Sequence, residues 1–319
     1  MDSFLGFPLA PEQASTLAKQ LDPLFLFLVG VAVFFASLIC ILILWFAFKY
    51  RRRPGNLEGA VVHGGLSLEI LWTVIPFGLT MIMFFWGAKL YFITFHPPPN
   101  ALELSVVGKQ WMWKIQHPEG QREINELHIP VGRPIKLVLT SQDVIHDFFV
   151  PAFRVKTDVI PGRYTSIWFE ATKPGEYHLF CSQYCGTQHA GMIGRVIVMS
   201  QTDYQTWLGG GNATITMADA GAQLFTTFGC ISCHKENDTG RGPSLAGLYG
   251  RNVKLRNGAT VVADDDYIRE SIMNPQAKIV AGYQPLMPTF KGLISEDGIV
   301  QLIAYIKSIN PGERAEAQR

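Results

Sequence analysis

The residues best suited to chemistry in this 319-residue chain are four of its five cysteines, which form two close pairs. The pairs are Cys181 with Cys185 and Cys230 with Cys233, and each has a histidine a few residues downstream. The fifth cysteine, Cys40, lies inside an apolar run. Thiols paired beside histidine are typical of sites that hold a metal ion or a haem group.

The first pair lies in a twelve-residue segment rich in soft ligands, Cys181-Ser-Gln-Tyr-Cys185-Gly-Thr-Gln-His189-Ala-Gly-Met192. One thiolate, two imidazoles and a weak methionine describe a blue-copper centre, whereas two thiolates can bridge a pair of copper ions. A second imidazole is still needed, and His146 is the best candidate because it follows a predicted strand of the same domain. The segment therefore predicts a copper site.

Two other interpretations of this segment stay open at this point. Cys181 and Cys185 could form a disulfide in an oxidising compartment, which would leave His189 and Met192 without a role. A zinc ion on two cysteines and two histidines is also chemically sound, although zinc gains little from a methionine.

The second pair, Cys230-Ile-Ser-Cys233-His234, has the spacing of covalent haem attachment, with two thioethers and an adjacent histidine for the iron. Taken alone, the same spacing also fits a redox dithiol or half of a zinc site. Met287 lies 53 residues after His234 in a proline-flanked loop before a predicted final helix. We therefore predict a c-type haem with His234 as proximal and Met287 as distal ligand.

Two apolar segments near the N-terminus predict a transmembrane hairpin. Residues 24–48 are 25 uncharged positions, which as a helix span about 37 Å, more than the roughly 30 Å core of a bilayer. Residues 70–88 are a second uncharged stretch of 19 positions. A cleaved signal peptide competes for the first segment, but its basic start and small-residue cleavage site are missing.

The loop between the two apolar segments sets the expected orientation. It carries one lysine and three arginines within residues 49–53, against Glu58 and Glu69. Because positive loops stay in the cytoplasm, both termini and everything from about residue 96 onward are expected on the outer face.

The outer part divides by its pattern into two domains. Short apolar or alternating runs separated by turns predict a small antiparallel sandwich or barrel over residues 96–208. The glycines at 209–211 predict a flexible connector within residues 201–218. The pattern of residues 219–319 predicts a separate, mostly helical domain. An acidic run at residues 264–266 predicts a solvated loop. The predicted parts are 1–95 (N-terminal segment and hairpin), 96–208, the linker 209–218, and 219–319.

Charge excludes one large class of partners. Lys and Arg number 27 against 26 Asp and Glu, so the formal net charge is +1. Nucleic acid is therefore not an expected partner, because its binding needs a basic surface. Hydrophobic residues make up 48% of the chain and charged residues 17%, which agrees with a part in the lipid bilayer.

The membrane hairpin and the copper segment together resemble subunit II of haem-copper cytochrome c oxidase, over roughly residues 20–205. Further features carry the resemblance: Asp143-Val-Ile-His146, Lys156-Thr-Asp158-Val-Ile-Pro161-Gly162-Arg163 and the aromatic pair Trp111-Met-Trp113. The resemblance implies a cupredoxin-like Greek-key β-barrel that holds two copper ions per chain, the dinuclear CuA centre. The implied ligands are Cys181 and Cys185 (bridging thiolates), His146, His189, Met192 and the backbone carbonyl of Gln183.

The same resemblance gives roles to three more positions. Trp111 matches the aromatic residue that accepts electrons, although a tryptophan in the barrel core is the simpler interpretation. Glu69 matches a glutamate at the mouth of a proton path, although a carboxylate at a helix N-terminus is more often merely solvated. Gln183 stands where the family often has a glutamate that helps to bind magnesium at the subunit interface, so magnesium is in doubt.

Residues 219–319 resemble an all-α class I cytochrome c. In that family a loop like the one containing Pro243 offers its proline carbonyl to the proximal imidazole. Gly221, Phe225 and Tyr305 resemble the close helix crossing of the same family.

The resemblances together imply subunit II of a proton-pumping cytochrome c oxidase, an oxidoreductase and translocase of the bacterial inner (cytoplasmic) membrane. Electrons would pass from an external donor through one covalent haem c and CuA to the haem-copper catalytic subunit, where oxygen is reduced to water. This chain has no oxygen-reducing site, so a multi-span subunit I and a subunit III are the implied partners. The alternatives are the electron-entry subunit of a nitric oxide reductase and a membrane-anchored copper carrier or thiol redox protein.

Overall fold

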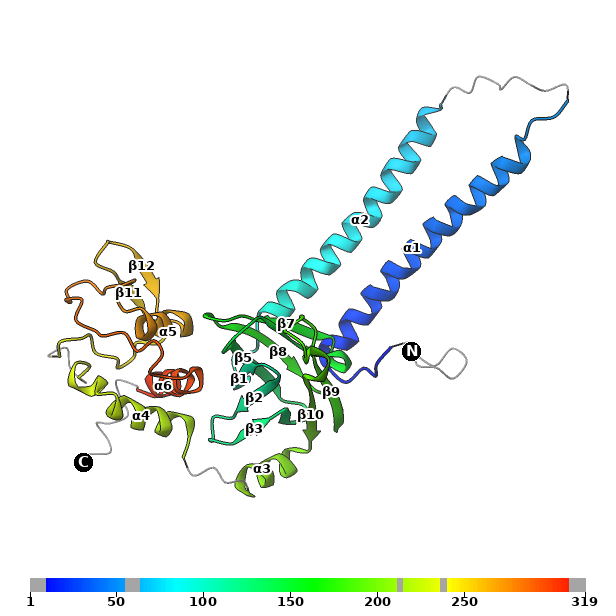
Figure 1. Ribbon diagram of the computed structural model, residues 1–319. Helices are drawn as coiled ribbons and strands as arrows, with labels where there is room; N and C mark the ends of the chain where they lie inside the picture. Colours follow the sequence, from blue (N-terminus) through cyan, green and yellow to red (C-terminus); the bar gives the residue numbers. More distant parts are fainter. Residues whose placement is uncertain (1–9, 55–63, 211–214, 236–239, 310–319) are drawn as a thin grey trace. The chain divides into compact units, whose positions relative to one another are not determined.

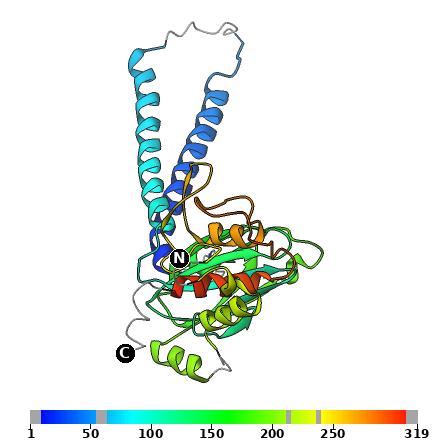
Figure 2. The ribbon, with the colours of Figure 1, turned by 90° about the vertical axis from the view of Figure 1, so that its left-hand side faces the viewer.

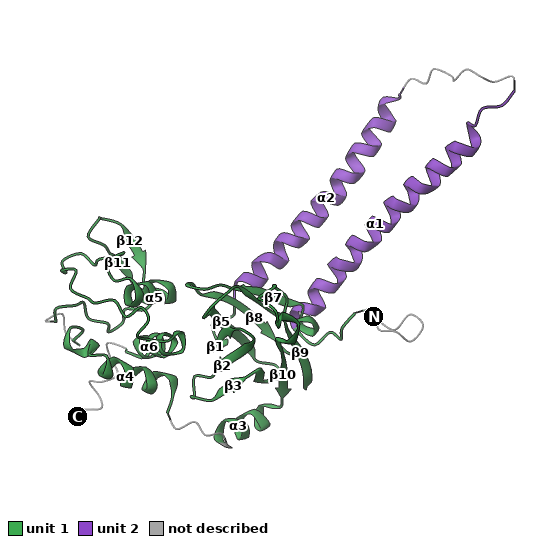
Figure 3. Ribbon diagram, viewed as in Figure 1, with its two compact units in different colours: residues 1–15, 97–319 green, residues 16–96 purple. Residues whose placement is uncertain are grey.

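The computed structural model describes residues 10–54, 64–210, 215–235 and 240–309. The chain forms two compact units, one of residues 16–96 and one of residues 1–15 with 97–319 (Figure 3). Each unit is described by itself below.

The smaller unit is a pair of long helices, α1 (Thr16–Lys49) and α2 (Leu66–Phe95) (Figure 1). Their most apolar windows have mean hydropathies of 3.0 and 1.9, and none of the side chains in these windows is buried. Both helices are long and apolar enough to cross a membrane, which confirms the predicted hairpin. Helix α1 begins eight residues before the uncharged run, and α2 continues through Pro76.

The β domain, which we define as residues 102–199, holds two five-stranded sheets (Figures 1 and 2). The first sheet has the order β3 (Arg122–Ile124), β2 (Met112–Gln116), β1 (Leu102–Lys109), β5 (Pro134–Ser141), β8 (Thr165–Glu170). The second has the order β4 (Glu126–Pro130), β10 (Ile193–Met199), β9 (Gly175–Cys181), β6 (His146–Val150), β7 (Val155–Val159). Most pairings are antiparallel, as predicted.

Two strand pairs are parallel, β1 with β5 and β4 with β10. These pairs depart from the antiparallel prediction because the chain crosses between sheets instead of returning by a hairpin. Large apolar side chains fill the interior, and Trp113 and Phe148 are completely buried, with ring centroids 5.2 Å apart. The sandwich therefore has a packed core under the candidate copper segment.

The helical domain, which we define as residues 217–308, contains three helices and the short turn η3 (Cys230–Ser232) among its described residues. The helices are α4 (Met217–Thr227), α5 (Asp265–Met273) and α6 (Glu296–Ser308). It also has a two-stranded sheet of β11 (Asn252–Lys254) and β12 (Thr260–Val262). Ser295 caps α6 by accepting a hydrogen bond from the Gly298 N–H.

Helices α4 and α6 cross at very short range. A Cβ atom on Gly221 would lie 2.0 Å from the carbonyl oxygen of Gln301, so only glycine fits this point. The rings of Phe225 and Tyr305 lie beside the crossing, 5.3 Å apart. The close crossing expected from these residues is confirmed.

The flexible connector predicted over residues 201–218 is wrong for residues 201–210 and for Met217 and Ala218, which begin α4. Residues Gln201–Gly210 form helix α3, in which Tyr204 is completely buried and Trp207 stacks on His128 at 4.6 Å. The packing of Tyr204 and Trp207 on the β domain stabilises α3 by more than the low helix propensity of Gly209 and Gly210 destabilises it. Residues 211–214 lie outside the described residues.

The solvated loop predicted at residues 264–266 is also wrong. Asp264 is the N-cap of α5 and accepts a hydrogen bond from the Tyr267 N–H at 2.8 Å. Asp265 and Asp266 occupy the first helical turn, where carboxylates are favoured by the helix dipole. The acidic run is thus a helix start.

Candidate copper and haem sites

The copper segment folds as the loop between β9 and β10 and brings its soft atoms together. The Sγ atoms of Cys181 and Cys185 are 3.8 Å apart. His189 places Nδ1 3.5 Å from the Sγ of Cys185, and Met192 places Sδ 3.8 Å from the same sulfur. All four side chains of the motif therefore converge on one point.

The two remaining predicted ligands, one from outside the motif and one from its backbone, reach the same point. His146, the first residue of β6, places Nδ1 3.9 Å from the Sγ of Cys181. The backbone carbonyl of Gln183 lies 3.2 Å from that sulfur. His146, Cys181 and Cys185 are all buried, with ligand atoms within 4.8 Å of one another.

Asp143 is a further candidate residue of this site, which the sequence presents only as part of the Asp143-Val-Ile-His146 motif. Its Oδ1 lies 2.8 Å from Nε2 of His146, and its Oδ2 accepts a hydrogen bond from the Gln110 N–H at 2.8 Å. A carboxylate on one ring nitrogen leaves the other nitrogen, Nδ1, directed at the sulfur atoms. No spacing rule in the sequence gives Asp143 this role.

The chemistry of this pocket fits a soft metal ion. A sulfur separation of 3.8 Å rules out an S–S bond, which needs about 2.05 Å, so Cys181 and Cys185 are free thiols here. Met192 is only 1% exposed and lies against them, and a thioether has affinity for copper but little for zinc. The disulfide alternative is therefore not the state of this structure.

The two thiols differ in acidity. Burial alone would raise the pKa of Cys181, but hydrogen bonds from His146 and from the backbone of Asp147 and Gln183 bring it down from 9.0 to about 7. Burial and the nearby Cys181 thiolate raise the pKa of Cys185 to about 12. The pocket thus favours one thiolate even before a metal ion binds.

The two tryptophans of the Trp111-Met-Trp113 motif lie in different surroundings. Trp113 is buried and lies edge-on to the His146 ring, 5.9 Å between centroids, so it belongs to the core. Trp111 is half-buried beside the copper loop, since a Cβ on Gly186 would lie 3.2 Å from its ring.

Two features hold the backbone of the copper loop beside Trp111. Gly186 has a φ of +119°, a conformation that glycine adopts without strain. The side-chain amide of Gln110 donates a hydrogen bond to the Cys185 carbonyl at 2.7 Å.

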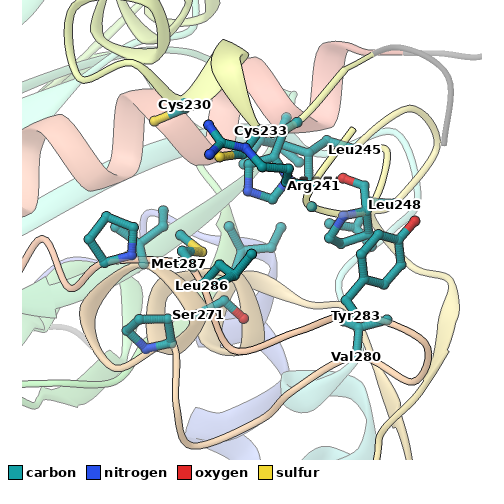
Figure 4. Close-up of a pocket in the computed structure, with 18 of the residues that line it drawn as sticks. Cys230, Cys233, Arg241, Leu245, Leu248, Ser271, Val280, Tyr283, Leu286 and Met287 are labelled. Atoms are coloured by element: carbon teal, nitrogen blue, oxygen red, sulfur yellow. Dashed lines mark hydrogen bonds between the residues drawn. The ribbon is translucent and has the colours of Figure 1, made fainter. Parts of the chain in front are cut away.

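The second candidate site is a cavity of about 390 Å³ in the helical domain. Figure 4 shows Cys230 and Cys233 on one side of it and Met287 facing across. His234 also lines the cavity, and its Nδ1 lies 2.9 Å from the carbonyl oxygen of Pro243, as predicted. The structure therefore brings together all five predicted haem-site residues.

The lining of the cavity fits a haem in its chemistry. Its walls are mainly apolar, and a Cβ on Gly242 would lie 2.8 Å from Cε1 of His234, so the loop holds the imidazole edge closely. The Pro243 carbonyl accepts the Nδ1 proton, which leaves Nε2 free for an iron ion. The main apolar lining residues are Phe225, Leu245, Leu248, Ile268, Ile272, Phe290, Leu302 and Ile306.

The proton-path candidate lies in the other unit. Glu69 occupies the first turn of α2 and its side chain is exposed. The structure places it at a helix N-terminus, and its further role stays a prediction.

A third cluster, which no motif in the sequence indicates, joins His117, Glu123 and His128. Glu123 accepts from Nε2 of His117 at 2.7 Å and from Nδ1 of His128. The Tyr204 hydroxyl of α3 lies 3.0 Å from Nδ1 of His117. Burial raises the pKa of Glu123, but the two histidines outweigh burial and lower it. The cluster fastens α3 to the β domain.

Comparison with known families matches three parts of the chain. Residues 5–89 match the transmembrane domain of Cytochrome C oxidase subunit II, and residues 120–200 match its periplasmic domain. Residues 218–310 match Cytochrome c.

Individual relatives agree with these matches. Cytochrome c oxidase subunit 2 of Alkalihalophilus pseudofirmus is 33% identical over 82% of this chain and 79% of its own length. The same-named protein of Thermostichus vulcanus is 31% identical over 62% of this chain and 77% of its own. The crystal structure of the periplasmic domain of subunit II of cytochrome oxidase of Bradyrhizobium japonicum is 34% identical, covering 36% of this chain and 95% of that chain, with a TM-score of 0.35.

Proposed function

The chain belongs to the cytochrome c oxidase subunit II family and carries a fused cytochrome c domain, and from this premise we propose that it is the electron-entry subunit of a proton-pumping terminal oxidase. The family domains indicate copper in the β domain and haem c in the helical domain. When bound, these groups supply one-electron couples, and the proposed order of transfer is external donor, haem c, CuA, oxygen-reducing subunit.

The copper pair is proposed to be held by the residues that converge in the β9–β10 loop. Cys181 and Cys185, whose Sγ atoms are 3.8 Å apart, would supply two thiolates to the copper ions, and His146 is oriented by Asp143. The remaining proposed ligands are His189, Met192 and the carbonyl of Gln183. Since the Gln183 side chain is a neutral amide, we propose no magnesium ligand at this position.

The haem is proposed to be attached through the thiols of Cys230 and Cys233. His234 and Met287 line the cavity and would supply an imidazole and a thioether to the haem iron. A thioether opposite an imidazole raises the reduction potential, which suits a site that passes electrons to an oxidase. Pro243 fixes the imidazole tautomer through its carbonyl.

Two further roles are proposed for residues outside the ligand sets. Trp111 is the proposed point of electron entry to the copper site, because it is half-buried beside the ligand loop. Glu69 is the proposed mouth of a proton path, because it lies exposed in the first turn of α2.

The chain is membrane-anchored, and its finer placement is part of the proposal. We place the hairpin in a bacterial inner membrane with both termini outside, because the connecting loop is basic. Subunit I and subunit III are the proposed partners beside the external donor. The proposed divisions are residues 1–95, 96–208, 209–218 and 219–319.

The observation that carries the proposal is the convergence of two thiols, two imidazoles and a thioether from the β9–β10 loop and the start of β6, in a chain that also has an apolar cavity lined by Cys230, Cys233, His234 and Met287. The test is to purify the complex that contains this chain, supply a chemical reductant with a soluble mediator, and record which gas is consumed. We expect oxygen consumption that Cys185→Ser abolishes. Consumption of nitric oxide in place of oxygen would favour the reductase alternative.

A further inference from the structure

The β domain and the helical domain, both within the larger unit, contact each other through residues that the proposed function does not use. The Tyr164 N–H, in the loop between β7 and β8, donates to Oδ1 of Asp266 in α5 at 2.7 Å. Arg269 of α5 donates from Nη1 to the Gly162 carbonyl of the same loop at 2.9 Å. The loop is therefore joined to α5 by two hydrogen bonds that include backbone groups.

Tyr164 extends this contact into the apolar interior. Its side chain packs against the hydrophobic core of the helical domain, although it belongs to the β domain. Its hydroxyl is buried, with no hydrogen-bond partner among the described residues. Burial, together with the nearby Glu296 carboxylate, raises the pKa of Tyr164 well above its usual range. The ring therefore acts as an apolar anchor, and its hydroxyl adds nothing to the contact.

Ion pairs between the β domain and the helical domain add to the contact made by Tyr164. Lys307 of α6 lies 2.7 Å from Glu103 of β1 and 2.9 Å from Asp265 of α5. Asp297 at the start of α6 lies 2.8 Å from Lys114 of β2. The side chains of Lys307 and Asp265 are only 23% and 14% exposed, so these charges are partly shielded from solvent.

Helices α5 and α6 each present two different faces. On α5, Ile268 lines the haem cavity while Arg269 contacts the β domain. On α6, Leu302 lines the haem cavity while Ile303 and Lys307 line a second cavity of about 220 Å³ together with β1 and β5 residues. The two helices therefore lie between the haem cavity and the β domain. Leu286, which also lines the haem cavity, is 61% exposed and remains uncovered.

We propose that the β7–β8 loop and strands β1 and β2 form a built docking site for the helical domain of the same chain, with Tyr164 as its anchor. The helical domain is then held in one orientation, with α5 and α6 against the β domain and the Leu286 side of its cavity open. This differs from a domain that moves freely on a linker. The inference concerns protein contacts and does not depend on the order of electron transfer.

The test measures how well defined the distance between the two domains is. Spin labels are introduced as non-natural amino acids at two exposed lysines, Lys156 of β7 and Lys254 of β11, so that no new cysteine competes for the cofactors. Pulsed EPR on the purified, fully reduced complex then gives the distribution of label distances. We expect one narrow distribution for the otherwise unaltered chain.

Three variants distinguish the loss of the Tyr164 contact from a general loss of stability. Tyr164→Ala should broaden the distribution at least twofold, whereas Tyr164→Phe should leave it narrow because the hydroxyl has no partner. Ile124→Ala, which truncates a side chain that is 63% exposed in the β domain, is the matched control and should also stay narrow.

Three results would overturn the docking site. These are a broad distribution in the unaltered chain, an unchanged distribution in Tyr164→Ala, and equal broadening in Ile124→Ala. If Tyr164→Ala does not assemble, Lys307→Gln replaces it, since this change removes the charge that pairs with Glu103 and Asp265. A narrow distribution in Lys307→Gln would then count against the proposal.

Discussion

At the residue scale, Asp143 is the clearest case of a side chain that acts through its neighbour. It holds Nε2 of His146 at 2.8 Å while Nδ1 faces the cysteines. We expect Asp143→Asn to weaken copper binding by about 10- to 100-fold, because carboxylates of this kind orient the ligand and increase its basicity. Competition titration with a copper chelator measures the change, with Glu119→Gln, a change at an exposed residue, as control. Equal affinities in both variants would remove Asp143 from the site.

Met287 allows a second prediction at this scale. Met287→Ala should leave the haem covalently attached, because the thioethers come from Cys230 and Cys233. The weak charge-transfer band of sulfur-ligated ferric haem should disappear, and the reduction potential should fall, since the thioether ligand raises it. Visible spectroscopy with a redox titration measures both. A band that survives would point to another ligand, and Met273, which packs against the same core, would be examined next.

Glu123 gives a prediction about pH. Its pKa in the folded state is lowered by His117 and His128, so its ionised form stabilises the fold above the unfolded-state pKa of about 4.3. That stabilisation is lost as the pH falls through the lower, folded-state pKa. Glu123→Gln should therefore cost about 1–3 kcal/mol near pH 7 and show less additional loss between pH 5 and 3. Thermal unfolding across that range tests this, and parallel pH profiles for the two proteins would contradict it.

At the element scale, the close crossing of α4 and α6 is the most sensitive packing contact. Gly221→Ala would place a Cβ 2.0 Å from the Gln301 carbonyl, so the helices must separate. We expect a loss of about 1–3 kcal/mol in the stability of the helical domain. Gly209→Ala in α3, where a Cβ meets nothing within 4 Å, is the control and should be neutral or stabilise by up to about 1 kcal/mol. Thermal unfolding followed by haem absorbance compares them, and similar effects would contradict the packing argument.

Some elements could be predicted from local sequence and others could not. The copper loop was predictable because Cys181 to Met192 lie within one turn between two strands, and the strand before His146 placed its imidazole nearby. Helix α3 could not be predicted, because its stability comes from Tyr204 and Trp207 packing on distant residues of the β domain. The same holds for the Glu123 cluster, whose members are joined only by the sheet.

Helix α5 failed for a different reason. The acidic run alone predicts a solvated loop, although Asp264 is a good N-cap and carboxylates suit a first helical turn. The sequence does indicate this helix once the acidic cap is considered together with the apolar residues that follow it, Tyr267, Ile268 and Ile272. Contacts between α5 and the loop containing Tyr164 were not predictable, because they join segments about 100 residues apart.

At the scale of the whole molecule, one chain combines a membrane hairpin, a β domain and a cytochrome c domain. The proposed role requires that both outer domains are loaded, because electrons that enter at a haem of the chain would need a copper acceptor to pass to. Neither group alone would distinguish this chain from a simple copper carrier or a simple cytochrome.

The most direct measurement is the metal and haem content of the purified chain, combined with its visible and near-infrared spectrum. The account predicts two copper ions and one haem per chain, a haem that resists acid acetone extraction, and a mixed-valence copper signal that Cys185→Ser removes. One zinc ion and no copper, or a haem that is fully extracted, would contradict it.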